Sequence, residues 1–400
     1  MESHSKNIIL QNCNTFSFEE LVEIINTGSV SIEELKEAGL SEEKLNSVLT
    51  LILAAKKDSE NKSEKDVFLN KIENRKVKAD EIKLKINNKI ISFDDLENLS
   101  SLSQKTINSL KYYTSSNRMT TFRTIEELPA MEEGRTDLYF IGVPGSGKST
   151  MLSSILHSAH RNGILLPDPY NQDGSIFQNQ LISDLNRGVL PQATAHGSYN
   201  YIALSIEGEN KKRHPFNIIE VPGENYVQMY NNGDVEQFLS YIQNSNKKIL
   251  VFVIDSLAHH TGYLESTDQN DQSLVYPNIL QLFHANGILE QTDAIYLVSN
   301  KFDAIYESLY AGDERPHEKI AEEFLYEEFL NLINNCKAVK DESKNKFKIK
   351  LLPFSIGKVS YETILESYNQ IYATNILNEI ISDSFIVKGG GLSKLFKRNK

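Results

Sequence analysis

The residues that could do chemistry begin in a glycine-rich stretch directly after a short apolar run, residues 138–142. There the pattern G-x-x-x-x-G-K-[ST] extends from Gly142 to Ser149. Loops of this pattern curl their backbone N–H groups around a phosphate, with glycines where a side chain would block the approach. The lysine reaches the outer phosphates, the hydroxyl binds Mg²⁺, and the following helix adds the positive end of its dipole. We therefore predict a phosphate-binding loop formed by Gly142, Gly145, Ser146, Gly147, Lys148, Ser149 and Thr150, with Lys148 catalytic and Ser149 a metal ligand.

An acidic residue and a glycine stand at the end of a later apolar run, residues 216–221. The segment reads Glu220-Val221-Pro222-Gly223-Glu224. In a loop that senses a phosphate, an acid at the strand end holds Mg²⁺ through water, and a glycine amide three residues later donates to the γ-phosphate. We therefore predict Glu220 as a metal ligand and Gly223 as a nucleotide-binding residue.

Two further loops have the chemistry of a guanine site. Asn300-Lys301-Phe302-Asp303 follows the apolar run 294–299, and Ser355-Ile356 follows the run 349–354. A carboxylate such as that of Asp303 can accept hydrogen bonds from N1–H and the exocyclic amine of guanine. Adenine offers neither donor there, so the buried carboxylate would be left unpaired. We predict that Asn300, Lys301, Asp303, Ser355 and Ile356 bind the nucleotide.

These loops require a scaffold, and after residue 138 the sequence alternates strand-like and helix-like segments, which is typical of a parallel-sheet α/β domain. Only GENKKRHP separates the second expected strand from the third, which is too short for a crossover helix. This pair should therefore form an antiparallel hairpin. We expect six strands, at 138–142, 201–206, 216–221, 249–254, 294–299 and 349–354, in a mostly parallel sheet with one antiparallel strand.

Residues 136–385 thus resemble a G domain of the translation-factor-related class of P-loop GTPases, which includes the Ras-like and Era-like families. Glu220 to Gly223 would match the family's Asp-x-x-Gly motif. The resemblance also implies a switch I threonine, for which we choose Thr194, with its hydroxyl on Mg²⁺ and its amide at the γ-phosphate. The Gly-x-x-Pro-x-x-Thr context of Thr194 is similar to that in a group of bacterial GTPases of conflict and stress systems. The implied cofactor is Mg²⁺ and the implied nucleotide is GTP or GDP.

Three departures from the family pattern predict slow hydrolysis. Glu220 replaces the aspartate of the motif and is one methylene longer. Glu224 stands where Ras-like members carry a water-orienting glutamine, and we assign it a catalytic position. Pro144 lies in the phosphate loop and offers no N–H. No arginine is placed to stabilise the transition state in cis, since Arg187, the nearest candidate, reads as a surface residue, and a partner can supply one.

The first 117 residues have a different texture and repeat a short unit. The frame at residues 11–21 returns at 25–35, and that at 72–82 returns at 86–96, each with an offset of 14. Serine followed three residues later by an acid is a capping box at a helix start. We expect two helical modules, at about 11–52 and 70–113, which bury their apolar faces on each other or on a partner.

Composition bounds the remaining possibilities. The chain of 400 residues has a net charge of −12, which argues against a nucleic-acid footprint over the whole chain. Its two cysteines, Cys13 and Cys336, lack metal-ligand spacing and fit a reducing compartment. No apolar run reaches transmembrane length and the N-terminus does not resemble a secretory signal, so we expect a cytoplasmic protein. The basic end, 389–400, reads as a flexible tail, with contact to an anionic membrane the less favoured reading.

The expected organisation is a helical repeat region at 1–117, a linker at 118–135, a GTPase-like domain at 136–388 and the tail. The function we expect is a Mg²⁺-dependent regulatory GTPase that signals to protein partners through its helical region and switch loops. Two alternatives remain open from the residues. One is a docking protein that holds the nucleotide and hardly hydrolyses it. The other is a P-loop ATPase that uses Asp255 as its Mg²⁺ acid. The oligomeric state is left open.

Overall fold

The computed structural model describes residues 6, 9–116, 124–192, 194, 198–208, 211–232, 236–261 and 271–384, without side chains at 54–63 and 230–232. The expected tail, 389–400, lies outside the described residues. Two compact units divide the chain: a helical unit, Met1–Ser103, and a sheet unit, Gln104–Lys400. No helix among the described residues has both the length and the apolar character needed to cross a membrane.

In the helical unit, short helices precede and follow the 32-residue helix α4 (Glu42–Glu73), and several helix starts are capped as the repeats predicted. Ser17, Ser31 and Ser92 each accept a hydrogen bond from the amide three residues later, and the acid at that position bonds back to the serine amide. The apolar residue directly after the capping acid is buried in each repeat: Leu21, Leu35, Ile82 and Leu96. The helices are α2 (Phe18–Asn26), α3 (Ile32–Glu37), α4 (Glu42–Glu73), α5 (Ala79–Asn87) and α6 (Phe93–Glu97).

The sheet unit is built on a seven-stranded, mostly parallel sheet of order β2-β3-β4-β1-β5-β6-β7. The α/β fold class and the β3–β4 antiparallel hairpin are confirmed. The expected count of six strands is wrong, because Leu165–Pro167 forms a short edge strand antiparallel to β3. Three residues that end in proline give no strand signal in a sequence. The strands are β1 (Thr136–Ile141), β2 (Leu165–Pro167), β3 (Asn200–Glu207), β4 (Arg213–Glu220), β5 (Lys247–Asp255), β6 (Thr292–Asn300) and β7 (Lys348–Phe354), with a separate hairpin of β8 (Val359–Ser360) and β9 (Ile364–Leu365).

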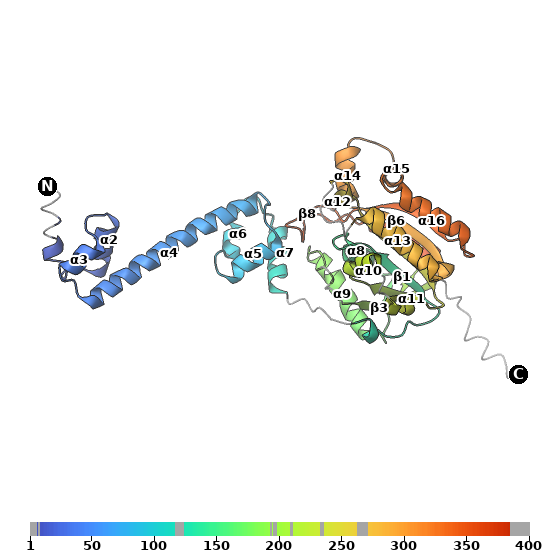
Figure 1. Cartoon of the computed structure of the whole chain (residues 1–400), viewed down its shortest axis with the longest axis horizontal. Helices are drawn as coiled ribbons and strands as arrows, with labels where there is room; N and C mark the ends of the chain where they lie inside the picture. The colour runs from blue at the N-terminus through green and yellow to red at the C-terminus, as the bar shows by residue number, and fades with distance from the viewer. Residues whose placement is uncertain are drawn as a thin grey trace. The chain divides into compact units, whose positions relative to one another are not determined.

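Helices cover both faces of this sheet (Figure 1). The central strands are buried on both faces, which is why they read as continuous apolar runs. One face packs against α10, α11, α13 and α16, and the other against α8, α9 and α17. The helical elements of this unit are α7 (Gln104–Ser115), η1 (Ile125–Glu127), α8 (Lys148–Arg161), α9 (Gln172–Asn186), α10 (Gly223–Asn232), α11 (Glu236–Ile242), α12 (Ser256–His260), α13 (Gln272–Ala285), η4 (Ile288–Gln291), α14 (Phe302–Leu309), α15 (His317–Glu328), α16 (Leu330–Glu342) and α17 (Ile371–Asp383).

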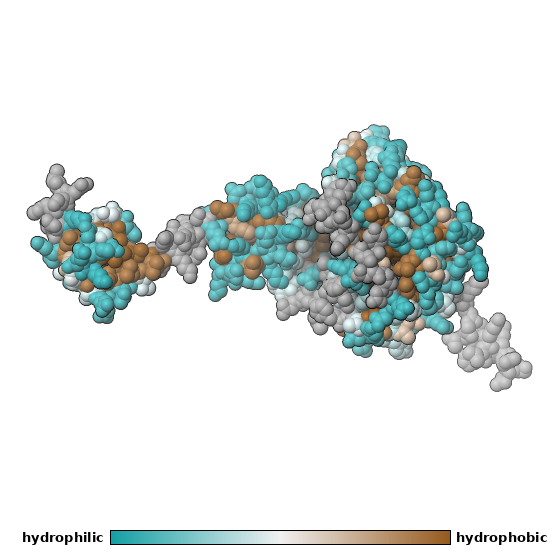
Figure 2. Space-filling model, viewed as in Figure 1, coloured by the Kyte–Doolittle hydropathy of each residue, from teal (hydrophilic) through white to brown (hydrophobic). Residues whose placement is uncertain are grey.

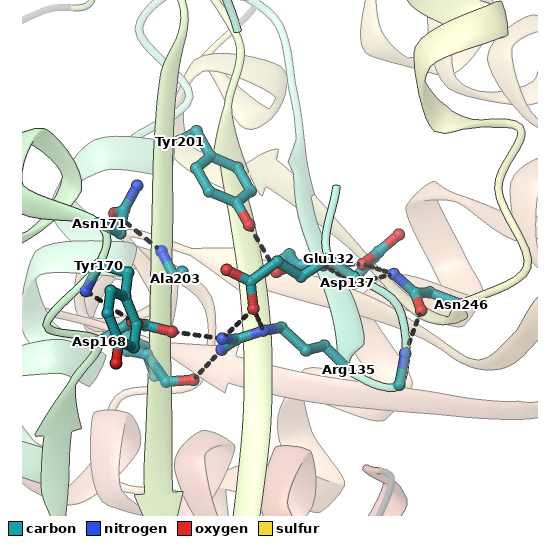
Figure 3. A network of polar contacts seen from close by, with 12 residues as sticks. Glu132, Arg135, Asp137, Asp168, Tyr170, Asn171, Tyr201, Ala203 and Asn246 are labelled. Atoms are coloured by element: carbon teal, nitrogen blue, oxygen red, sulfur yellow. Dashed lines mark hydrogen bonds and ion pairs between the residues drawn. The ribbon is translucent and has the colours of Figure 1, made fainter. Parts of the chain in front are cut away.

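A polar network lies at the start of β1, where the chain enters the sheet (Figure 3). The buried Asp137 carboxylate accepts hydrogen bonds from the side-chain amides of Asn217 and Asn246, at 2.8 and 3.0 Å. Both amides also donate to the Glu132 carbonyl oxygen, at 3.0 and 2.8 Å. Burial raises the pKa of Asp137, an effect these hydrogen bonds oppose. The end of the expected 118–135 linker is therefore held against the sheet by specific hydrogen bonds.

Candidate functional site

The glycine-rich loop joins the end of β1 to the start of α8, as the sequence predicted. Gly145 and Gly147 have φ angles of +76° and +90°, which favour glycine. A Cβ on Gly147 would lie 2.2 Å from Asn300 Nδ2, so this position also needs the absence of a side chain. At Gly142 a Cβ would meet the Ser146 hydroxyl at 2.4 Å. The loop is thus closely packed against the Asn300 segment.

Lys148 is buried at the first turn of α8 and turns back over the loop. Its ammonium group donates to the carbonyl oxygens of Gly142 and Val143, at 2.9 and 3.3 Å. Burial lowers the pKa of Lys148 to about 8, against the opposing effect of the Glu220 and Glu224 carboxylates. A phosphate bound over the loop would supply the negative counter-charge that the Lys148 ammonium group lacks.

The three residues predicted as metal ligands lie together. Ser149 and Thr194 contact each other through their hydroxyl groups at 3.2 Å, and the Thr194 hydroxyl donates to Glu220 Oε1 at 3.0 Å. The Ser149 hydroxyl donates to the same carboxylate oxygen. Two hydroxyls and one carboxylate are oxygen donors of the type that Mg²⁺ prefers, and Mg²⁺ usually completes its shell with water and phosphate. The donor set therefore fits this ion.

Asn200 contacts the other oxygen of the Glu220 carboxylate. This role of Asn200 was not predicted from the sequence. Its side-chain amide donates to Glu220 Oε2 at 3.2 Å. The two residues are direct partners in the β3–β4 hairpin, so the register of the hairpin puts Asn200 opposite the acid. A polar residue at the first position of the strand opposite Glu220 was the signal available in the sequence. Oε1 is left facing the hydroxyls of Ser149 and Thr194.

The loop after Glu220 approaches the glycine-rich loop closely. A Cβ on Gly223 would lie 2.4 Å from the backbone nitrogen of Pro144, so only glycine fits there without displacing backbone. Gly223 starts α10, and Glu224 follows, half-buried, in its first turn. The next side chain, Asn225, donates to the hydroxyl of Tyr199, just before β3. Asn200 and Tyr199 thus contact Glu220 and the start of α10, respectively.

Asn300 and Lys301 lie at the end of β6, beside the glycine-rich loop. Asn300 Nδ2 donates to the Ser146 carbonyl oxygen at 2.6 Å. Lys301 has a left-handed backbone, with φ of +56°, and its ammonium group pairs with Asp255 Oδ2 at 2.5 Å. Asp255 also caps α12 by accepting from the Ala258 amide at 3.0 Å. Both carboxylate oxygens of Asp255 therefore have partners other than Ser149.

The remaining predicted base-binding residues come from the two neighbouring loops. Asp303 lies half-buried in the first turn of α14. Burial, helped by the nearby Asp303 carboxylate, raises the pKa of Tyr372 to about 12. Ser355 and Ile356 are buried after β7, where the Ser355 hydroxyl accepts from the Gly357 amide at 3.2 Å. Thr150 lies half-buried in the first turn of α8.

Helix α13 supports this site from behind, which the sequence pattern did not indicate. The Tyr276 hydroxyl accepts from the Val143 amide at 3.3 Å and donates to the Val253 carbonyl oxygen at 2.8 Å. Gln272 accepts from the Asp255 amide at 2.7 Å and donates to the Asp255 carbonyl oxygen at 3.0 Å. Tyr276 and Gln272 therefore link the glycine-rich loop to the end of β5.

The other candidates for the site are Arg187 and clusters of metal-ligating side chains. Arg187 is exposed at the end of α9, and its guanidinium lies 5.8 Å from the centre of the Tyr112 ring. Among the described residues, no hydrogen bond or ion pair joins its guanidinium to the cluster at Glu220. Within the described part of the chain, no group of three or more histidine, cysteine, aspartate or glutamate side chains could hold a metal ion.

Comparison with known proteins bears on the same residues. A family model described as Double-GTPase 1 matches residues 139–276. A solved chloroplast translocon component, from work on atToc33 and psToc159, whose dimerization is important for GTPase activity, is 14% identical. That match covers 62% of this chain and 82% of that chain, with a TM-score of 0.33. Sup35 complexed with GDP is 15% identical, over 60% of this chain and 43% of that chain, with a TM-score of 0.27. No curated protein matches the chain.

Proposed function

We propose that this protein is a Mg²⁺-dependent regulatory GTPase with slow intrinsic hydrolysis, a proposal supported by the match of residues 139–276 to the Double-GTPase 1 family model. GTP would occupy the glycine-rich loop, with its base at Asn300, Lys301, Asp303, Ser355 and Ile356. The switch loops at Thr194 and Glu220 would change with the γ-phosphate and so distinguish GTP from GDP.

The observation that carries the proposal is the cluster of Ser149, Thr194 and Glu220. These residues come from the glycine-rich loop, the segment before β3 and the end of β4, and their side-chain oxygens lie within 3.2 Å of one another. Mg²⁺ would be held at this cluster and would neutralise charge on the β- and γ-phosphates. A ligand contributed by Thr194 makes the site dependent on the conformation of the switch segment.

The chain's own residues would act in two ways. Lys148, released from the Gly142 and Val143 carbonyl oxygens, would pair with the β- and γ-phosphates and stabilise charge there. Glu224 lies next to Gly223 and would orient the attacking water, but its negative charge would face that of the γ-phosphate. This repulsion, with the missing N–H of Pro144, supports slow turnover.

The ATPase alternative is less well supported by the geometry. It requires Asp255 to hold Mg²⁺ near Ser149, whereas the Asp255 carboxylate pairs with Lys301 and caps α12. Glu220 bonds directly to the Ser149 hydroxyl. Glu220 is therefore the better metal acid of the two.

We also propose that protein partners bind the helical unit. On α4, Leu51 and Leu53 are 41% and 66% exposed, and Figure 2 shows apolar surface on this part of the chain. Apolar surface that is contiguous, rather than single exposed apolar side chains, favours contact with another protein.

Phosphate release by the purified full chain tests the proposal against a docking protein that never hydrolyses GTP. We expect slow, Mg²⁺-dependent release that Lys148→Ala abolishes. GTP binding without release above background, even with proteins that co-purify with the GTP-bound form, would contradict a switch hydrolase. The docking alternative would then stand.

A further inference from the structure

Helix α7 packs against the chain segment that leads to Thr194. The Ser109 hydroxyl donates to the Arg187 carbonyl oxygen at 2.8 Å, and the Tyr112 hydroxyl donates to Asp184 Oδ1 at 2.9 Å. Gly188 has a φ of +71°, and a Cβ on it would lie 2.6 Å from the Ser109 hydroxyl oxygen. In the segment 187–190, which we call the strap, Gly188 therefore has no room for a side chain beside α7.

The strap is held on another side by the β8–β9 hairpin. The Leu190 amide donates to the Thr363 carbonyl oxygen at 2.8 Å, and the Leu365 amide donates to that of Gly188 at 2.9 Å. Lys105 of α7 donates to the Glu366 carbonyl oxygen at 2.8 Å, so α7 contacts the hairpin as well. The hairpin follows the Ser355–Ile356 loop after only two residues, 357 and 358.

The strap thus connects two loops that would hold the nucleotide. Four residues after its end, Thr194 reaches Ser149 and Glu220. The chain on either side of the hairpin reaches the loop assigned to the base: β8 follows that loop after residues 357 and 358, and after β9 the Asn369 amide donates to the Ile356 carbonyl oxygen at 2.9 Å. Movement of the strap would therefore change the metal side and the base side together.

We propose that α7 controls nucleotide release by holding the strap, with Ser109 and Tyr112 as positioning residues for both loops. This inference rests on the proposed function and adds the element that regulates it. Since α7 directly follows the helical unit in the chain, a partner that moves α7 would change how long GDP or GTP is retained. Coupling between two sites is reciprocal, so bound nucleotide must in turn hold α7 more firmly against the strap.

The test measures release of a fluorescent GDP analogue from the full chain. We expect Ser109→Ala combined with Tyr112→Phe to speed release about fivefold or more, the lower range of a coupling between sites. Ser115→Ala is the matched control, because that hydroxyl bonds only to carbonyl oxygens of its own helix, those of Lys111 and Tyr112. It should release GDP at the wild-type rate.

A second, independent test compares substitutions at two glycines. Gly188→Ala places a methyl group against Ser109, whereas Gly163→Ala meets nothing within 4 Å at a similar φ of +68°. Both substitutions carry the same backbone cost, so release that is faster in Gly188→Ala alone comes from the lost contact with α7. Amide exchange should also show faster exchange over 187–190 in this variant, and slower exchange over α7 when wild type binds GDP.

The outcomes separate the two proposals. Wild type that binds GDP while all variants release it at the wild-type rate would overturn the role of α7 and leave the GTPase proposal intact. Wild type that binds no guanine nucleotide would overturn both. If circular dichroism shows that the variants are unfolded, amide exchange of the wild-type protein decides instead. Unchanged protection of α7 on GDP binding would then contradict the inference.

Discussion

At the residue scale, the main electrostatic cost in the site is the burial of the Lys148 ammonium group. The side chain is buried against carbonyl oxygens rather than a carboxylate, and this burial lowers its pKa from 10.5 to about 8. Between these pH values the unfolded chain holds more protons than the folded chain, so this group's contribution to stability rises with pH there. Nucleotide binding must behave oppositely, because phosphates need the charged ammonium.

This reversal predicts how affinity depends on pH. Above about pH 8, binding of GDP must take up one proton on Lys148, so the dissociation constant should rise by up to about tenfold per pH unit. Titration of GDP by calorimetry from pH 7 to 9.5 measures this slope. Lys148→Arg keeps its charge over this range and should give a flat profile. A slope that persists in Lys148→Arg would assign the effect to another group.

The metal cluster predicts a graded effect of two substitutions. Glu220→Gln removes the charge that would hold Mg²⁺, and Asn200→Ala only frees the carboxylate from its support at Oε2. We expect Asn200→Ala to raise the Mg²⁺ concentration needed for tight GTP binding by about tenfold, the usual effect of removing such a support. Glu220→Gln should have a larger effect.

A control for these variants lies at the other end of the same hairpin. Glu207 pairs with Arg213 in the β3–β4 register, far along the strand from Glu220. Glu207→Gln should leave the Mg²⁺ requirement unchanged. An Asn200→Ala protein with the wild-type requirement would show that the hairpin does not position Glu220.

At the element scale, the backing of the site by α13 predicts a split between stability and binding. Tyr276→Phe keeps the ring but removes the hydroxyl that contacts the Val143 amide and the Val253 carbonyl oxygen. Unfolding in denaturant should show a loss of about 1 kcal/mol. Nucleotide affinity should fall as well, because Val143 lies inside the glycine-rich loop.

Tyr296→Phe is the matched comparison for this effect. Tyr296 is also fully buried, and its hydroxyl donates to Asp383 Oδ2 at 2.8 Å, away from the glycine-rich loop. It should lose similar stability without losing affinity. Equal affinity losses in both variants would mean that Tyr276 acts only through general stability.

The same scale shows what the sequence could predict. The strands β1, β4, β5, β6 and β7 contain long apolar runs, so their positions and order could be predicted from the sequence. The spacing of the glycines likewise predicts the position of the phosphate-binding loop. The edge strand β2 is too short to give such a signal. Asn200 and Tyr276 act through strand register and helix packing, which depend on contacts between residues distant in sequence. Helix α7 reads as a repeat but packs on the sheet unit.

At the scale of the whole molecule, the division after Ser103 predicts two unfolding transitions. A ligand that binds only the native sheet unit should stabilise that unit by about 2.7 kcal/mol at a concentration 100 times its dissociation constant. Scanning calorimetry with GDP should therefore shift one transition and leave that of the helical unit unchanged. A single transition that shifts as a whole would show that the units unfold together.

The central claim is a guanine-specific site, and competition with labelled GDP tests it most directly. In Mg²⁺, unlabelled GTP should displace the label at concentrations at least about 100-fold below those of ATP, because adenine would leave the Asp303 carboxylate unpaired. Asp303→Asn should weaken GTP and remove this preference. Tight ATP binding that is indifferent to Asp303→Asn would contradict the account.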